Sequence, residues 1–187
     1  EAAAAGFLDG NIYVLTEKGE IAYRGKTPAG TIVKSIALSD RATRLAVHYG
    51  NTEHDGVLCV NLENKKERAF ALPVRKPMRT AIHVTDSGNI AILDGEQFII
   101  SSDDGEIISK TTLPPVKEGH SAIAFSRNIY SLSFRQKKGG SALYLFTREG
   151  LPIMTRSFPS ESYLDTSIRG NTVIARGLDS LYAWNIE

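Results

Sequence analysis

Short stretches in which apolar and polar residues alternate run through the whole chain. One region contains four in a row, at 79–85, 89–93, 97–102 and 106–114, separated by Ser-Gly and Asp-Gly pairs. Stretches of this length, rich in β-branched and aromatic residues and joined by such turns, are typical of antiparallel strands in hairpins. Helical periodicity is nearly absent. The best helix candidate, the alanine run at 1–5, is too short to hold a helix alone.

The same pattern recurs with a fixed period. Four prolines are spaced 45, 41 and 45 residues apart, and a Gly or Asn stands nine residues before each. A period in this range predicts a β-propeller of about four to five four-stranded antiparallel blades. An antiparallel β-sandwich is the alternative, but a sandwich does not require the period. The prolines are Pro28, Pro73, Pro114 and Pro159, and the turn residues are Gly19, Asn64, Gly105 and Gly150.

The period divides one domain, residues 1–187, into repeat units. They are 6–28 (partial), 29–73, 74–114, 115–159 and 160–187 (partial). The turn residues are expected to supply the positive φ of the turn between the third and fourth strands. Each unit from the second onward has an isoleucine at the matching position of its first strand, and these side chains are expected to pack between blades. They are Ile36, Ile82, Ile123 and Ile168.

The two outer units are incomplete. The first is predicted to begin with a second strand at 6–10, and the last ends after its third strand. The two ends therefore cannot complete one blade together, because both supply a second and a third strand. We expect the chain to be a segment of a larger propeller in a longer protein, or to complete itself with a second copy.

Composition narrows the class of protein without naming a function. With 42% hydrophobic residues and 22 Lys+Arg against 21 Asp+Glu, the chain has ordinary globular composition. This balance gives no reason to expect a nucleic-acid partner, and no apolar run is long enough for a transmembrane segment. Cys59, the single cysteine, excludes an internal disulfide and is expected to be a buried, inert thiol. The compartment stays undecided, with a lean towards an extracytoplasmic one.

Few residues suggest chemistry. His48 and His54, with Glu53 and Asp55 beside them, carry donor types that bind metals. The alternation places His48 in a strand and His54 in a loop, so a solvated polar loop is the preferred interpretation and no metal site is expected. His83 is expected on the opposite strand face from its two apolar neighbours, as a structural histidine. No catalytic residues are predicted.

Basic residues gather in one class of loop. In a propeller, the connections between blades and the turns between second and third strands lie at one end of the blades. A surface lined with one sign of charge attracts a partner of opposite charge. The alternative is that long basic side chains merely solubilise these loops. The candidate binding residues are Arg75, Lys76, Arg79, Lys117, Lys137 and Lys138, with Lys26 in an equivalent loop.

The segments 11–25 and 143–157 resemble the repeat of PQQ-like and WD40-like bacterial β-propellers. In those repeats an aromatic-apolar strand, a turn centred on Gly and a final strand recur in each blade. The resemblance covers most of the chain and implies a propeller. The tryptophan that follows the turn in quinoproteins is missing, and Tyr23 and Arg24 stand nearest to its place. No cofactor is therefore expected.

Three hypotheses for function follow. The leading one is a non-enzymatic scaffold that binds another protein or a neighbouring domain of the same chain. The second is an extracytoplasmic ligand-sensing or adhesion domain whose basic loops take an anionic ligand. The third, a quinoprotein-like or glycosidase-like enzyme, is disfavoured, because it would need inward-facing carboxylates that the sequence does not place.

Overall fold

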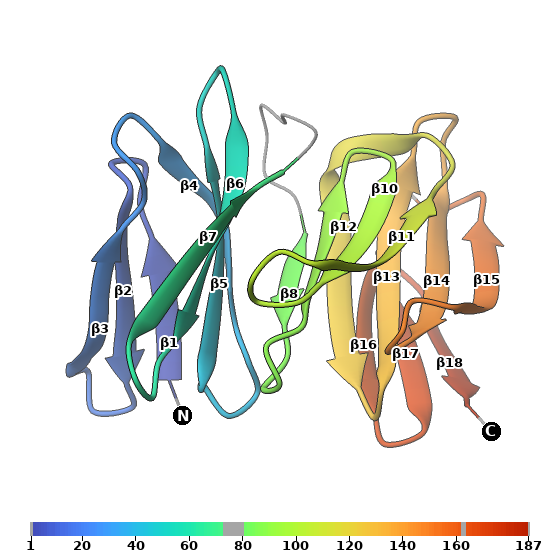
Figure 1. Cartoon of the computed structure of the whole chain (residues 1–187). Helices are drawn as coiled ribbons and strands as arrows, with labels where there is room; N and C mark the ends of the chain where they lie inside the picture. The colour runs from blue at the N-terminus through green and yellow to red at the C-terminus, as the bar shows by residue number, and fades with distance from the viewer. Residues whose placement is uncertain (1, 73–80, 162–163, 187) are drawn as a thin grey trace.

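The computed structural model describes residues 2–72, 81–161 and 164–186, and these form five antiparallel sheets (Figure 1). The first sheet contains β1 (Ala2–Gly6), β2 (Asn11–Thr16) and β3 (Ile21–Lys26). The second contains β4 (Ile32–Leu38), β5 (Arg44–Gly50), β6 (Asp55–Asn61) and β7 (Lys66–Ala71). The third contains β8 (Ile82–Val84), β9 (Ile90–Asp94), β10 (Gln97–Ser101) and β11 (Ile107–Thr112). The fourth contains β12 (Val116–Ser126), β13 (Ile129–Gln136), β14 (Ser141–Thr147) and β15 (Pro152–Phe158). The fifth contains β16 (Asp165–Arg169), β17 (Thr172–Arg176) and β18 (Leu181–Asn185).

Each sheet is a meander in which every strand pairs with its neighbour in sequence. The three middle sheets match the three complete repeat units, and each has four strands. The first and fifth sheets have three strands each among the described residues. The prediction of an all-β chain built from four-stranded antiparallel blades is therefore confirmed.

Hydrophobic clusters join each sheet face to face with the next. One cluster joins the first and second sheets, and three more join the second to the third, the third to the fourth and the fourth to the fifth. The four predicted isoleucines are partly buried, and each packs against a different one of these clusters. Their expected position between blades is confirmed. They are Ile36, Ile82, Ile123 and Ile168.

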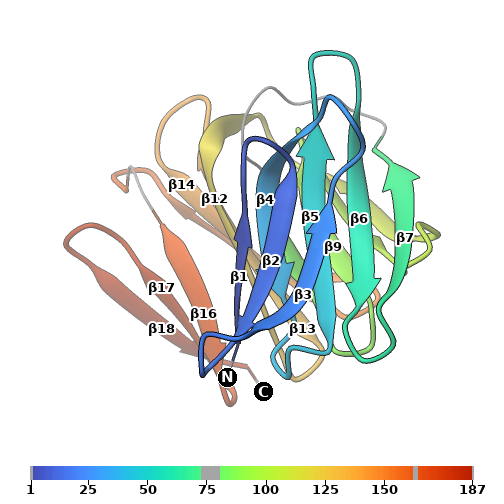
Figure 2. The ribbon, with the colours of Figure 1, turned by 90° about the vertical axis from the view of Figure 1, so that its left-hand side faces the viewer.

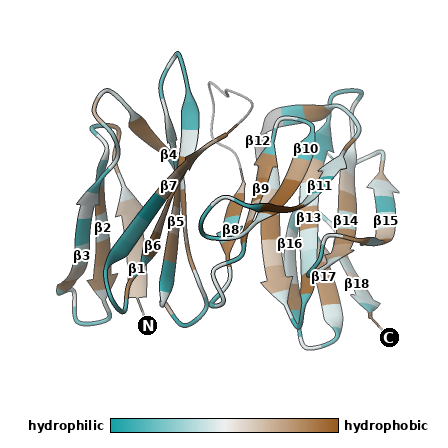
Figure 3. Ribbon diagram, in the orientation of Figure 1, coloured by the Kyte–Doolittle hydropathy of each residue, from teal (hydrophilic) through white to brown (hydrophobic). Residues whose placement is uncertain are grey.

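The sheets fan out as an open arc when the molecule is viewed from the side (Figure 2). None of the clusters that the described residues form joins the first sheet to the fifth. Within each sheet, apolar residues concentrate in the inner strands, and the outer strands alternate between apolar and polar residues (Figure 3). Four inner strands consist mainly of buried residues and therefore pack against other sheets on both faces; they are β5, β6, β9 and β13. The outer strands β7 and β11 instead present about every second residue to solvent.

The first strand lies elsewhere than predicted. The alanine run forms β1, and residues 7–10 form a turn instead of a strand. Gly10 has a φ of 83°, and its N–H donates to the carbonyl of Phe7 at 3.1 Å. A glycine in the left-handed region ends an extended strand. Glycine suits the last position of β1, because a Cβ atom at Gly6 would collide with Val33 of the next sheet.

Three of the four predicted positive φ angles occur at the predicted residue, at Gly19, Gly105 and Gly150. In the second sheet the residue with positive φ is Lys65, at 56°, rather than Asn64. The Asn64 Oδ1 atom accepts a hydrogen bond from the N–H of Lys66 at 3.0 Å. This local hydrogen bond stabilises the turn at Asn64, and the residue with positive φ is the next one, Lys65.

Candidate functional site

The predicted basic loops are described in part. We call the end of the sheets that carries the β5–β6 and β13–β14 turns the loop end; it is uppermost in Figure 1. Lys137 and Lys138 lie in the β13–β14 turn and are exposed. Lys117 is also exposed, but it lies at the start of β12 and not in a loop as predicted, because β12 begins at Val116.

Lys117 and Lys137 are on neighbouring segments, since Val116 pairs with Gln136 and the N–H of Lys137 donates to the carbonyl of Pro115 at 2.9 Å. The Lys137 Nζ atom lies 3.3 Å from Glu96 Oε1 in the β9–β10 turn. Lys26 ends β3 in the first sheet and is separated from this group by two sheets. Arg75, Lys76 and Arg79 lie outside the described residues.

The polar residues near His48 form a buried network. The side chains of His48 and Asp55 are fully buried, and that of Lys34 is 4% exposed. The Asp55 carboxylate lies 3.1 Å from His48 Nε2 and accepts a hydrogen bond from the Lys34 ammonium. The pairing of β4 with β5 shifts its register between Val33 and Ser35, and this bulge aims Lys34 at the carboxylate. Burial lowers the pKa of His48, although Asp55 opposes that effect.

This network differs from the solvated polar loop that the sequence predicts. Glu53 and His54 are exposed, and their N–H groups donate to Asn51 Oδ1 at 2.8 and 3.0 Å. Asp55 instead begins β6 and is buried. The Asp55 carboxylate contacts both the Lys34 ammonium and the His48 ring. No group of three or more His, Cys, Asp or Glu residues in 2–72, 81–161 and 164–186 could hold a metal ion.

His83 lies where the strand alternation predicts. Its neighbours Ile82 and Val84 pack in the cluster between the second and third sheets. The His83 ring faces the other way, 6.0 Å from the ring of Phe125 and 6.4 Å from that of Tyr130. Burial lowers the pKa of His83, which favours the neutral ring.

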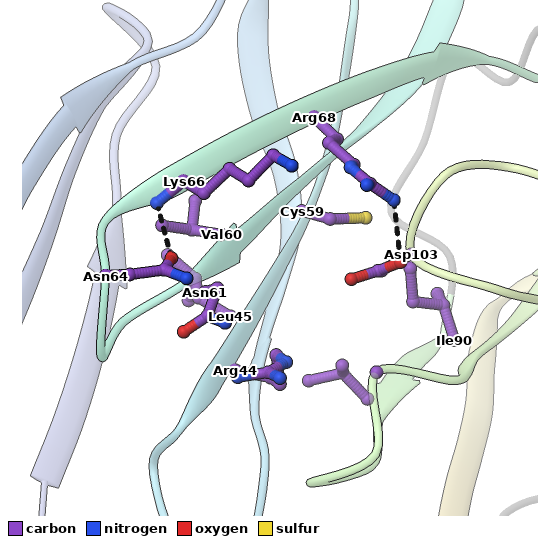
Figure 4. A pocket seen from close by; sticks show the side chains of 12 residues that line it. Arg44, Leu45, Cys59, Val60, Asn61, Asn64, Lys66, Arg68, Ile90 and Asp103 are labelled. Carbon is purple, nitrogen blue, oxygen red and sulfur yellow. Dashed lines mark hydrogen bonds and ion pairs between the residues drawn. The ribbon is translucent and has the colours of Figure 1, made fainter.

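A cleft of about 210 Å³ lies between the second and third sheets, at the end opposite the loop end (Figure 4). Its floor is apolar and includes Leu45, Val60, Val84 and Ile90, each no more than 2% exposed. Cys59 also lines it, and burial raises the pKa of this thiol to about 12. The expectation of a buried Cys59 is confirmed, and a thiol with that pKa is a poor nucleophile near neutral pH.

Charged side chains surround this apolar floor. Figure 4 shows Lys66 and Arg68 on β7 at one side of the cleft, Arg44 at the other, and Asp103 beyond the Cys59 sulfur. Arg68 Nη1 lies 3.2 Å from a carboxylate oxygen of Asp103 and 3.2 Å from one of Asp104. Arg44 donates to the carbonyl of Thr43 at 3.1 Å and lies 3.5 Å from Glu63 Oε2.

The sequence analysis did not find this cleft. Its lining residues come from two repeat units and from turns that were assigned only local roles. The signal available in the sequence was the pair Lys66 and Arg68, which alternation places on one face of the fourth strand of the second unit. The opposite wall of the cleft includes Asp103. Its position in the cleft can be predicted only when the packing of the two sheets is known.

Comparisons with known proteins identify the fold. No protein-family model and no curated protein matches the sequence. Among solved structures, the Dos1 propeller aligns with a TM-score of 0.63 and 13% identity over 97% of this chain and 52% of its own. The WD40 domain of Neurospora crassa Pan2 aligns with a TM-score of 0.64 and 8% identity, over 95% and 57% of the two chains. Hydrazine synthase of Kuenenia stuttgartiensis aligns with a TM-score of 0.62 and 12% identity, over 89% and 49%.

The fold is thus that of a β-propeller, and at these identities the likeness shows the fold alone. The chain spans about half the length of the propeller chains it matches. A propeller-repeat resemblance is confirmed, while nothing in the comparisons singles out the PQQ-like group. The described residues include no helix with the length and hydropathy of a membrane span.

Proposed function

We propose that this chain is a non-enzymatic β-propeller scaffold that binds an acidic surface of a protein partner or of a neighbouring domain. The observation that carries the proposal is the cluster of exposed lysines at the loop end of the fourth sheet. Lys117 and Lys138 have no ion-pair partner among the described residues, and Lys137 has only the exposed Glu96. Exposed ion pairs of this kind contribute about 0–1 kcal/mol, so Glu96 leaves Lys137 available for another carboxylate.

Charge reversal at the loop end tests this proposal. We expect Lys117→Glu with Lys138→Glu to weaken binding to poly-L-glutamate, used as the probe, and to flatten its dependence on salt. Each exposed contact is worth about 0.2–1 kcal/mol, so the double variant is needed for a clear effect. Titration calorimetry at several salt concentrations measures both quantities.

The matched control is Lys18→Glu with Lys110→Glu. It changes net charge equally, but Lys18 lies in the β2–β3 turn at the other end and Lys110 lies on the outer strand β11. A loss of binding that is the same in both double variants would contradict the proposal, since net charge alone would then explain it.

We also propose that further blades cover the outer faces of the first and fifth sheets, supplied by a longer chain or by a second copy. The first sheet buries Ile12 and Val14 against the second sheet. Strand alternation therefore turns Tyr13 and Leu15 outward, where they pair with Ala5 and Ala3 of β1. An apolar sheet face beside an unpaired strand edge favours association.

This proposal makes a prediction about the 187-residue chain on its own. We expect it to self-associate as its concentration rises, because other copies then cover the outer faces and the edge of β1 that pairs with no strand of the described residues. Analytical ultracentrifugation over a concentration series measures this. A chain that stays monomeric at all concentrations and binds no hydrophobic dye would show that these faces need no cover.

A further inference from the structure

The cleft between the second and third sheets is distinct from the loop end and opens among the turns at the opposite end. Asn64 lies in the β6–β7 turn, Gly88 in the β8–β9 turn and Asp103 in the β10–β11 turn, and all three line it. Two sheets therefore contribute to one concave surface with an apolar floor. Concave sites with an apolar floor and a few polar groups are where ligands bind.

The charged side chains around the cleft carry mostly hydrogen-bond donors, and some of these are already paired. Arg68 pairs with Asp103 and Asp104, and Arg44 Nη1 donates to the carbonyl of Thr43 and lies 3.5 Å from Glu63 Oε2. The Arg44 Nε atom is buried and has no hydrogen-bond partner in the part of the chain that the structure describes. The Lys66 ammonium has no ion pair within that same part. A buried donor that lacks an acceptor is costly, so Arg44 favours a ligand that supplies one.

Two asparagines add to this excess of donors. Asn61 Oδ1 accepts from the N–H of Glu63 at 3.0 Å, and Asn64 Oδ1 accepts from the N–H of Lys66 at 3.0 Å. Each amide oxygen already accepts one backbone hydrogen bond, and each amide NH₂ group can donate to a ligand. Asp103, the carboxylate among the lining residues, is paired with Arg68 at 3.2 Å.

We propose that this cleft binds a carboxylate group carried on a short apolar body, with Arg44 and Lys66 as the residues that recognise the charge. A guanidinium and a carboxylate form charge-assisted hydrogen bonds, which are stronger than neutral ones. The aliphatic stems of Lys66 and Arg68, which line the cleft above the buried floor, then contact the carbon atoms of the ligand. The volume of about 210 Å³ is below the roughly 300–1,000 Å³ of sites for drug-sized molecules, so the ligand has few carbon atoms.

A carboxylate of this size has two sources, a free short-chain acid or the glutamate side chain of a protein. Titration calorimetry with glutarate and with a blocked tripeptide that has one central glutamate distinguishes them. Binding of glutarate alone identifies a small-molecule site, and binding of the peptide alone identifies a site for a protein side chain. Glutaramide, which has the same shape without charge, is expected not to bind.

Variants at the two cations decide whether the proposal holds. We expect Arg44→Gln with Lys66→Gln to weaken binding of the active probe about tenfold or more, because two charge-assisted contacts are lost. Arg44→Lys keeps the charge but not the planar fork, and is expected to bind with intermediate affinity. Lys18→Gln with Lys110→Gln, outside the cleft, is the matched control because it removes the same number of charges.

Circular dichroism and thermal unfolding verify that each variant is folded. If Arg44→Gln does not fold, Lys66→Gln alone carries the test, because Lys66 is exposed and its loss leaves the core intact. Failure of both glutarate and the peptide to bind the unaltered chain would overturn the proposal. Equal binding by the unaltered chain and the folded Arg44 and Lys66 variants would overturn it as well. Neither result would affect the proposed role of the loop end, which the Lys117 and Lys138 variants test separately.

Discussion

Replacing Asp55 by alanine is expected to lower the free energy of unfolding by about 3–5 kcal/mol, the range found when one partner of a buried ion pair is removed. The Asp55 carboxylate is fully buried and binds both the Lys34 ammonium and the His48 ring. The substitution removes the negative charge that compensates the Lys34 ammonium, while the ammonium stays buried away from water. Urea denaturation monitored by circular dichroism measures the loss.

Two further variants separate this electrostatic effect from a loss of packing. Lys34→Met combined with Asp55→Leu removes both charges, and it is expected to be less destabilising than Asp55→Ala alone. Asp9→Ala, at an exposed carboxylate that accepts hydrogen bonds from Asn11 in the β1–β2 turn, is the surface control and should cost much less than Asp55→Ala. A cost of Asp55→Ala as small as that of Asp9→Ala would mean that the buried network does not stabilise the fold.

Replacing Phe98 by alanine is expected to cost about 3–5 kcal/mol, as for other large aromatic side chains removed from a core. Phe98 is 2% exposed, and its ring stacks on Phe146 with 4.7 Å between centroids. It also makes an edge contact with Tyr130 at 6.1 Å. Because β10 belongs to the third sheet and β13 and β14 to the fourth, the variant leaves a cavity at the contact between the two sheets.

The same denaturation experiment tests Phe98→Ala, with Phe7→Ala as the matched control. Phe7 is 48% exposed in the β1–β2 turn, so the same change of side chain there removes far less buried area. The two variants should therefore differ by at least about 2 kcal/mol. Similar midpoints for both would contradict the assignment of Phe98 to an essential contact between sheets.

Much of the fold could be predicted because its determinants are local. Alternation along each strand and Gly or Asn at the turns define the meanders, and the period alone places Ile36 and its equivalents between sheets. The alanine run was harder. Its composition favours a helix, whereas pairing with β2 and the contact between Gly6 and Val33 select a strand. Tertiary contacts override such weak local preferences.

The buried network and the cleft could not be predicted from local sequence patterns, because they depend on how strands pair and how sheets pack. The strand alternation placed His48 in a strand, but the bulge beside Lys34 that completes its network is a property of the paired register. The cleft arises only when two sheets pack, so Arg44 and Asp103, from different units, could not be associated. The turn that holds Lys137 and Lys138 could be placed from the order of strands, whereas Lys117 lies in β12 and not in the predicted loop.

The open row of sheets also has a consequence for cooperativity. Each middle sheet is held by two hydrophobic clusters, whereas the first and the fifth are each held by one. In arrays whose units contact only their neighbours, stability is approximately a sum of unit and interface contributions. The end sheets of such an array separate first, at a free-energy cost below that of global unfolding. Amide protons of β2 and β17 should therefore exchange with solvent faster than those of β9, although all three are central strands of their sheets. In a closed ring every sheet would have two neighbours, and this difference in exchange rate would disappear.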